Sequence, residues 1–156
     1  MWIASKLKAL FYTKASLLVL VKKDFKMLRD SELLSLGKKI ALVGGKQALK
    51  YFRQNFVKFN NKSHGGFDPV SIADKSAERV MRGMIKKNRP QDGIIGEEFG
   101  ILKGNSGLTW VLDPIDGTRA FMAGQTSWTV LLSLNEGDQQ HFGIIYQPFT
   151  DEMFVG

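Results

Sequence analysis

The sequence predicts an α+β fold in which two long helices pack on an antiparallel sheet, and three observations lead to this class. The first half carries apolar residues spaced three or four apart, which is the period of a helix that is buried along one face. Beyond Pro90 the period changes to short apolar runs separated by turn residues, which is typical of strands. The chain has 156 residues, 44% of them hydrophobic, so it is long enough to bury a core.

The two helices are expected over residues 30–55 and 71–88. In the first, apolar residues form one stripe that Gly44 and Gly45 interrupt, which predicts close packing or a bend. The second opens with Ser71 and Asp74 in the spacing of a capping box, and Pro90 follows its end.

Five strands are expected after Pro90, with a hairpin turn over residues 135–138 (NEGD) and another turn over 148–151 (PFTD). The strands are expected over residues 93–96, 108–112, 127–134, 141–146 and 152–156.

Charge is divided unevenly along the chain. Residues 1–91 hold 20 Lys and Arg against 6 Asp and Glu, whereas residues 92–156 hold 2 against 9. Because the basic half shows no recognised nucleic-acid-binding motif, we expect a solvated basic surface and no nucleic-acid partner. No apolar run approaches the roughly 20 residues that span a bilayer, so no membrane partner is expected. With no cysteine, a metal must be held by oxygen or imidazole, and a reducing cytoplasm is compatible with the composition.

Residues 1–29 are expected to form a basic extension outside the fold. They superficially resemble a signal peptide, but no small-residue cleavage site follows the apolar run. The alternative is a start assigned too far upstream, with Met27 as the true one. In either case, residues 30–156 are expected to be the functional part. Their last strand is apolar and no closing helix follows it, which suggests the first part of a larger fold.

Acidic residues stand at the expected strand ends. Glu97 follows one strand, Asp113 follows the next, and Asp116 comes three residues later. The intervening Pro114 and the following Gly117 allow a sharp turn, so two carboxylates can face one point, as hard cations such as Mg²⁺ prefer. Free amides at the start of a short helix after Gly117 would suit a phosphate. The alternative is that Asp-Pro and Asp-Gly are ordinary turn dipeptides.

Three motifs together resemble the inositol monophosphatase superfamily of metal-dependent phosphomonoesterases. They are residues 67–74 (FDPVSIAD), 96–98 (GEE) and 110–118 (WVLDPIDGT), in the order and approximate spacing of that family. The resemblance covers about residues 28–156, roughly the first half to three-fifths of a typical member. It implies the N-terminal, metal-binding part of a layered α/β sandwich of the sugar-phosphatase type.

The resemblance also implies metal ligands. Glu97, Asp113 and the carbonyl of Ile115 resemble the ligands of a first Mg²⁺, and Asp113 and Asp116 resemble those of a second. A complete family site holds two or three ions.

Asp74 and Thr118 resemble the pair that activates water for direct in-line attack on the phosphate, without a phosphoenzyme. Gly117 and Thr118 resemble the phosphate-binding amides. Asp74 keeps a second interpretation as the acidic member of its capping box.

Residues 116–121 (DGTRAF) and 146–156 look most like the bacterial histidinol-phosphatase branch. This implies hydrolysis of histidinol phosphate in histidine biosynthesis, a small phosphorylated metabolite as partner, a cytoplasmic location and a homodimer. Arg119 is a candidate substrate contact, because bisphosphate nucleotidases often place a basic residue there. Its alternative is a solvated helix residue.

One family segment, Trp-Asp-x-x-Ala-Gly, does not occur in these 156 residues. The resemblance implies that its aspartate completes the second metal site, so we expect impaired activity from this chain by itself. The open alternatives are an inositol monophosphatase, a 3'(2'),5'-bisphosphate nucleotidase, and an inactive remnant or metal-binding partner subunit.

Overall fold

The computed structural model describes residues 30–54, 59–61 and 69–156, and it divides into two compact units, Met1–Ser35 and Leu36–Gly156. Of the first unit, the described residues 30–35 are helical. The rest of the fold belongs to the second unit. The predicted extension over residues 1–29 lies outside the described residues.

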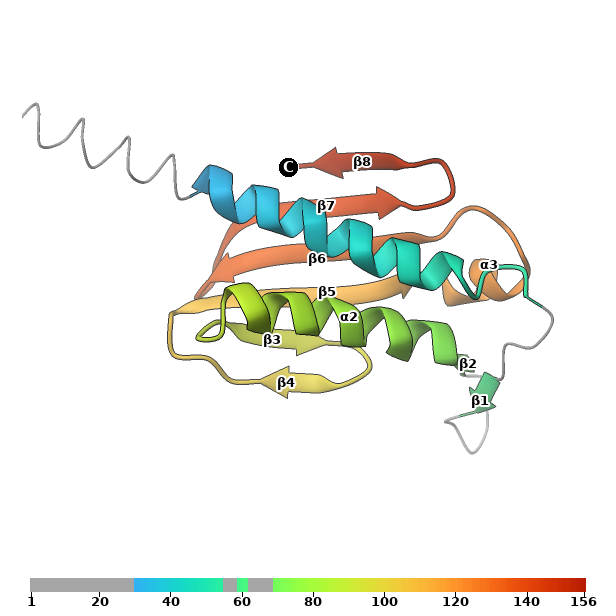
Figure 1. The fold of residues 1–156 in the computed structure, drawn as a ribbon, viewed down its shortest axis with the longest axis horizontal. Helices are drawn as coiled ribbons and strands as arrows, with labels where there is room; N and C mark the ends of the chain where they lie inside the picture. Colours follow the sequence, from blue (N-terminus) through green and yellow to red (C-terminus); the bar gives the residue numbers. More distant parts are fainter. Residues whose placement is uncertain (1–29, 55–58, 62–68) are drawn as a thin grey trace, which may run out of the picture. The chain divides into compact units, whose positions relative to one another are not determined.

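Two long helices, one short helix and eight strands make up the described secondary structure (Figure 1). The first helix runs over residues 30–49, shorter than expected, and α2 runs over Ile72–Asn88. A short helix, α3 (Thr118–Met122), follows Gly117. The strands are β1 (Phe59–Asn61), β2 (Pro69–Ser71), β3 (Gly93–Gly96), β4 (Gly100–Leu102), β5 (Leu108–Asp116), β6 (Thr129–Glu136), β7 (Gln139–Gln147) and β8 (Glu152–Val155).

Six of these strands form one sheet in the order β4-β3-β5-β6-β7-β8. Every neighbouring pair is antiparallel except β3 and β5, which run parallel. The layered α+β prediction is therefore confirmed, but the sheet is mixed rather than antiparallel. β3 and β5 can be parallel because β4 reverses the chain between them.

The five expected strands all form, and β3 has the predicted bounds. β4 was not expected, because its three residues are all exposed and lack an alternating pattern. β1 and β2 pair antiparallel as a separate two-stranded sheet, and neither strand was expected. A three-residue strand with two asparagines carries almost no β signal.

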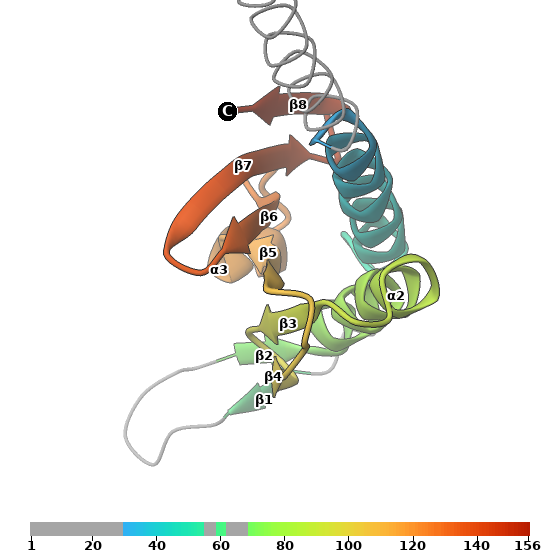
Figure 2. The ribbon, with the colours of Figure 1, turned by 90° about the vertical axis from the view of Figure 1, so that its left-hand side faces the viewer.

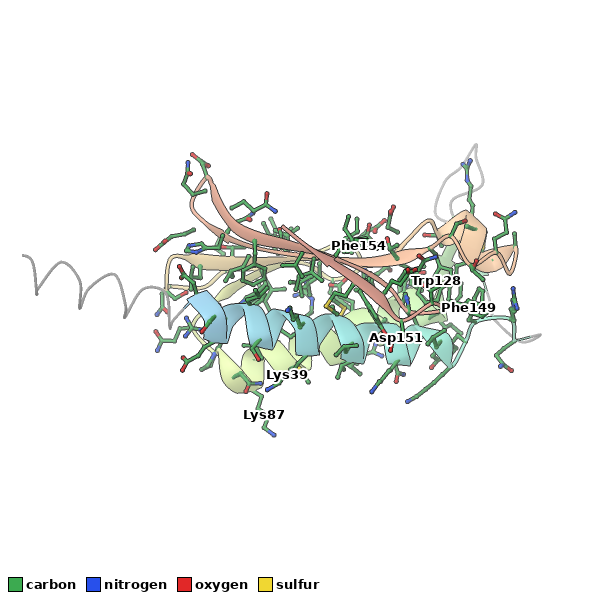
Figure 3. The ribbon with its side chains drawn as sticks, turned by 90° about the horizontal axis from the view of Figure 1, so that it is seen from above. Lys39, Lys87, Trp128, Phe149, Asp151 and Phe154 are labelled. Atoms are coloured by element: carbon green, nitrogen blue, oxygen red, sulfur yellow. The ribbon has the colours of Figure 1, made fainter. Side chains whose placement is uncertain are left out.

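Within the second unit, helix residues 36–49 and α2 lie on the same side of the six-stranded sheet (Figure 2). Lys39 and Lys87 point from these helices away from the sheet, and Phe154 lies on the sheet's other side (Figure 3). On β7, Phe142, Ile144 and Tyr146 are buried whereas Ile145 is exposed. This alternation is expected of a sheet with helices on one face.

The helix continues through Gly44 and Gly45, and both glycines lie where neighbouring residues pack closely, which confirms the predicted close packing. A Cβ at Gly44 would lie 2.6 Å from the Met81 sulfur on α2. A Cβ at Gly45 would lie 2.5 Å from the Tyr146 ring and 2.7 Å from Pro148. The missing side chains let the helix approach both α2 and β7.

An aromatic cluster packs beside the start of α2. The rings of Phe52, Phe121 and Trp128 have centroids 4.9–5.5 Å apart. Ala73, from the first turn of α2, and Ile115, from the end of β5, belong to the same buried cluster. This packing brings the start of α2 against the segment that joins β5 to α3.

No helix in the described part of the chain is long and apolar enough to cross a membrane.

Candidate metal centre at the carboxyl ends of β3 and β5

Parallel pairing of β3 and β5 places their carboxyl ends at one end of the sheet, the end where α2 begins and α3 lies (Figure 1). Gly96, the last residue of β3, pairs with Leu112. The residue that follows each of them is acidic, Glu97 after Gly96 and Asp113 after Leu112. The Glu97 amide donates to the Leu112 carbonyl at 3.3 Å, which holds the two residues side by side.

Asp113 occupies an environment that disfavours its ionised form. Burial, the charges of Glu97 and Asp116, and a hydrogen bond with Glu97 raise the pKa of Asp113 to about 7. One of its carboxylate oxygens, Oδ1, is buried and has no hydrogen-bond partner among the described residues. The three carboxylates therefore concentrate negative charge around an oxygen that has a free lone pair.

Asp116 lies three residues further along β5, and it is exposed. The pairing of β5 with β6 shifts register between Asp113 and Asp116. Pro114, which has no amide hydrogen, sits inside that irregularity. The strand was expected to end at Leu112 before a turn, but β5 continues through this irregularity to Asp116. The shift leaves Asp116 close enough to Asp113 to raise its pKa through charge repulsion.

Thr118 donates its hydroxyl to the Ile115 carbonyl at 3.1 Å. That carbonyl keeps a second lone pair, so it can still accept a cation. Gly117 precedes α3 with φ of 85°, a left-handed conformation that glycine adopts without strain. The predicted roles of Gly117 and Thr118 in holding phosphate stay predictions.

Asp74 lies in the first turn of α2 and is 5% exposed. Its neighbour Ala73 packs in the cluster that contains Ile115 and Phe121, so Asp74 and Thr118 stand on adjoining elements. The water-activating role of this pair stays a prediction. Arg119 is exposed on α3, and its substrate contact stays a prediction as well.

The residues present fit a hard divalent cation. The buried, unpartnered Asp113 oxygen and the surrounding negative charge are satisfied most simply by a cation. Within the described ranges, no group of three or more His, Asp or Glu side chains is arranged to hold a metal ion. The ligand sets that the family resemblance implies, Glu97 with Asp113 and the Ile115 carbonyl for one ion and Asp113 with Asp116 for another, stay predictions. Water and phosphate oxygens would complete the coordination of such ions.

Sequence reasoning missed two buried charged residues beside this site, Glu78 and Arg82. The signal was present, because Asp74, Glu78 and Arg82 recur every four residues along α2 and so form one stripe. The buried apolar residues Ala77, Met81 and Ile85 flank this stripe. A charged stripe beside the apolar face of an amphipathic helix is usually assigned to solvent.

Comparison with known proteins gives consistent results. Residues 29–156 match the model of the inositol monophosphatase family. The chloroplastic bifunctional phosphatase IMPL2 of Arabidopsis thaliana is 36% identical over 83% of this chain and 38% of its own length. The histidinol-phosphatase of Chlorobaculum parvum is 34% identical over 78% of this chain and 46% of its own.

Solved structures match as well. The extragenic suppressor protein SuhB of Bartonella henselae superposes with a TM-score of 0.75 at 27% identity, over 80% of this chain and 48% of its own. An inositol monophosphatase of Zymomonas mobilis has a TM-score of 0.64 at 36% identity, over 81% of this chain and 47% of its own. The chain thus spans less than half the length of these relatives. It belongs to the inositol monophosphatase family.

Proposed function

We propose that the protein is a Mg²⁺-dependent phosphomonoesterase that hydrolyses histidinol phosphate to histidinol and phosphate. The observation that carries the proposal is the environment of the half-buried Asp113. Its carboxyl lies beside Glu97 and Asp116, one of its oxygens has no hydrogen-bond partner among the described residues, and its pKa is raised. Family membership supports a phosphatase, and relatives named histidinol-phosphatase from three bacteria support the substrate.

Each residue has a distinct role in this proposal. Bound divalent cations would lower the pKa of water and neutralise charge on the phosphate oxygens. Glu97, Asp113, Asp116 and the Ile115 carbonyl would hold them. Asp74 would take a proton from the attacking water, with Thr118 orienting it, and the amides of Gly117 and Thr118 would steady the phosphoryl group.

Arg119 would contact the anionic substrate from its exposed position on α3. The proposed setting is the cytoplasm, with a small phosphorylated metabolite as ligand and a homodimer as the assembly. Nucleic acid and membrane are not proposed as partners.

The first test is cation binding by the 156-residue chain. Isothermal titration with Mg²⁺ should detect binding, and Asp113→Asn should weaken it by about tenfold or more, because both pairs of carboxylates share Asp113. Asp138→Asn, in the exposed turn between β6 and β7, is the matched control and should bind as the wild type does. Equal binding by Asp113→Asn would refute the site.

The second test is phosphate release from histidinol phosphate, inositol monophosphate and a nucleoside 3',5'-bisphosphate. We expect little turnover from the 156-residue chain. Losing one electrostatic contact to the transition state typically costs about 10²–10³ in rate, and a carboxylate of the second site would be missing. A chimera that adds the remaining part of the Chlorobaculum relative should be active, Mg²⁺-dependent and selective for histidinol phosphate. Preference for another substrate would refute the histidinol assignment.

A second candidate is a cation-binding subunit without turnover of its own. It rests on the same carboxylates, whose surroundings fit a cation whether or not turnover follows. Cation binding together with an inactive chimera would favour it.

A further inference from the structure

A buried ion pair on α2 lies next to the candidate metal centre. Glu78 is fully buried and Arg82 is 9% exposed. The Arg82 Nε donates to Glu78 Oε1 at 2.6 Å. The two residues are one helical turn apart, so the pair needs no other element to form.

The same two side chains also bind the turn between β3 and β4. Glu78 Oε2 accepts the amide of Glu98 at 2.7 Å, and Oε1 accepts the amide of Phe99 at 3.2 Å. The Arg82 guanidinium donates to the Gly100 carbonyl. Two residues of the turn and the first residue of β4 are therefore tied by hydrogen bonds to one ion pair.

The Phe99 ring adds contacts to this arrangement. The guanidinium carbons of Arg79 and Arg82 lie 5.4 and 5.9 Å from its centroid, within the range of cation–π attraction. Gly96, just before the turn, leaves the space that the pair occupies, because a Cβ there would overlap Glu78 Oε1. We call this ion pair, together with its hydrogen bonds to residues 98–100, the Glu78–Arg82 clamp. The clamp lies directly against the end of β3.

Glu97 is the residue between these restraints. Its own amide is bound to Leu112 on β5, and the clamp holds residues 98–100 that follow it. Its side chain is exposed and shares a hydrogen bond with the Asp113 carboxyl. Pairing with β5 fixes the backbone at the Glu97 amide, and the clamp fixes the backbone of the residues that follow Glu97.

A buried ion pair contributes little net stability, because the desolvation of two charges offsets their attraction. An apolar pair of similar volume would fill the same space. What it could not do is accept two amides and donate to a carbonyl. The hydrogen bonds to the turn are thus the distinctive contribution of Glu78 and Arg82.

We infer that Glu78 and Arg82 are positioning residues that hold Glu97 in place and thereby set the affinity of the divalent-cation site. The inference rests on the proposed function, because it takes Glu97 as a ligand. Residues that orient metal ligands typically change metal affinity by roughly 10–100-fold when they are replaced.

The test is Mn²⁺ binding to the full 156-residue chain, measured by electron paramagnetic resonance of the free ion. Glu78→Gln keeps the volume but puts an amide NH₂ against donors, so it should raise the Mn²⁺ dissociation constant by about tenfold or more. Hydrogen exchange at the amides of Glu98 and Phe99 should become faster. Arg82→Lys keeps the positive charge but loses the fork that reaches both Glu78 and Gly100, and it should weaken binding in the same direction.

The matched control is Asp92→Asn, which alters another buried carboxylate at the opposite end of β3. Asp92 accepts hydrogen bonds from Arg89 at 2.9 Å and from the Trp110 indole at 2.9 Å. This variant should lower the thermal unfolding midpoint without changing Mn²⁺ affinity, which separates positioning from general destabilisation.

The outcomes distinguish the inference from the proposed function. If the wild-type chain binds no Mn²⁺, the metal site fails and the inference fails with it. If the wild type binds and Asp113→Asn does not, the site stands, and unchanged affinity in both Glu78→Gln and Arg82→Lys would then overturn the clamp's role alone. An equal loss of affinity in Asp92→Asn would also overturn it.

Discussion

Asp113 and Asp92 show how the surroundings of a carboxylate decide its charge. Burial opposes ionisation of both residues. At Asp92, hydrogen bonds from Arg89, Ser106 and Trp110 outweigh burial, and its pKa lies below the usual value. At Asp113 the neighbours are Glu97 and Asp116, which add negative charge, and its pKa rises. Asp92 is thus stabilised by residues of this chain, whereas Asp113 is left for a ligand to stabilise.

We expect Asp113→Asn to stabilise the cation-free chain at alkaline pH. The pKa rises from 3.8 to about 7 on folding, so the folded chain binds the proton more tightly than the unfolded chain. Wild-type stability from this group therefore falls as pH increases between these two values. The gain should reach roughly 1–2 kcal/mol at pH 8, after allowance for solvent screening.

Thermal unfolding with a chelator at pH 5 and pH 8 checks this prediction. The midpoint of Asp113→Asn should exceed that of the wild type, and the difference should be larger at pH 8. Added Mg²⁺ should stabilise only the wild type. Asp138→Asn is the control, and an equal gain there would contradict the assignment to Asp113.

The candidate ligands could be predicted from the sequence, because Glu97, Asp113 and Asp116 stand beside turn residues and within family motifs. The clamp residues Glu78 and Arg82 could not. Whether a charge is buried depends on the partner that another element supplies, here the amides of residues 98 and 99. Such a partner is invisible in local spacing.

Among the elements, the helices and longer strands were predictable because the spacing of their apolar residues indicates which face is buried. The helix over residues 30–49 and β5 follow this rule. The parallel pairing of β3 with β5 did not follow from their patterns, since pairing direction depends on the path of the chain through β4. An exposed three-residue strand such as β4 leaves no periodic signal.

We expect Gly45→Ala to destabilise the fold more than Gly44→Ala. Alanine favours a helix by about 1 kcal/mol over glycine at either position. At Gly45 the new Cβ would meet the Tyr146 ring at 2.5 Å and Pro148 at 2.7 Å, both of which are rigid. Overpacking of that kind costs about 1–3 kcal/mol or more.

At Gly44 the neighbour is the Met81 side chain, which can move to another rotamer. Gly44→Ala should therefore stay within about 1 kcal/mol of the wild type, and it serves as the control. Urea unfolding followed by circular dichroism measures both variants. A larger loss for Gly44→Ala would show that the approach to α2 is tighter than the approach to β7.

For the sheet as a whole, β4 and β8 are the outer strands. Each carries a large exposed apolar residue, Ile101 at 71% exposure and Phe154 at 59%. Unpaired edges with apolar side chains are templates for association between chains. Both edges of the described sheet can therefore pair with a strand of another chain.

We expect Ile101→Lys and Phe154→Lys to reduce self-association of the 156-residue chain, with the double variant the most monomeric. A charge at an edge opposes pairing with another strand. Sedimentation velocity across a concentration series checks this. Thr150→Lys adds the same charge at an exposed turn and should have little effect, so an equal reduction there would point to net charge instead.

The parallel pairing of β3 and β5 also bears on the order in which the chain folds. Only the turn over residues 97–99, β4 and a short loop over residues 103–107 separate the two strands, so bringing them together costs little chain entropy. The two strands can therefore meet before residues 36–49, far away in the sequence, dock on the sheet. A cation shared by Glu97 and Asp113 would bind this early nucleus, and it should accelerate refolding rather than only slow unfolding.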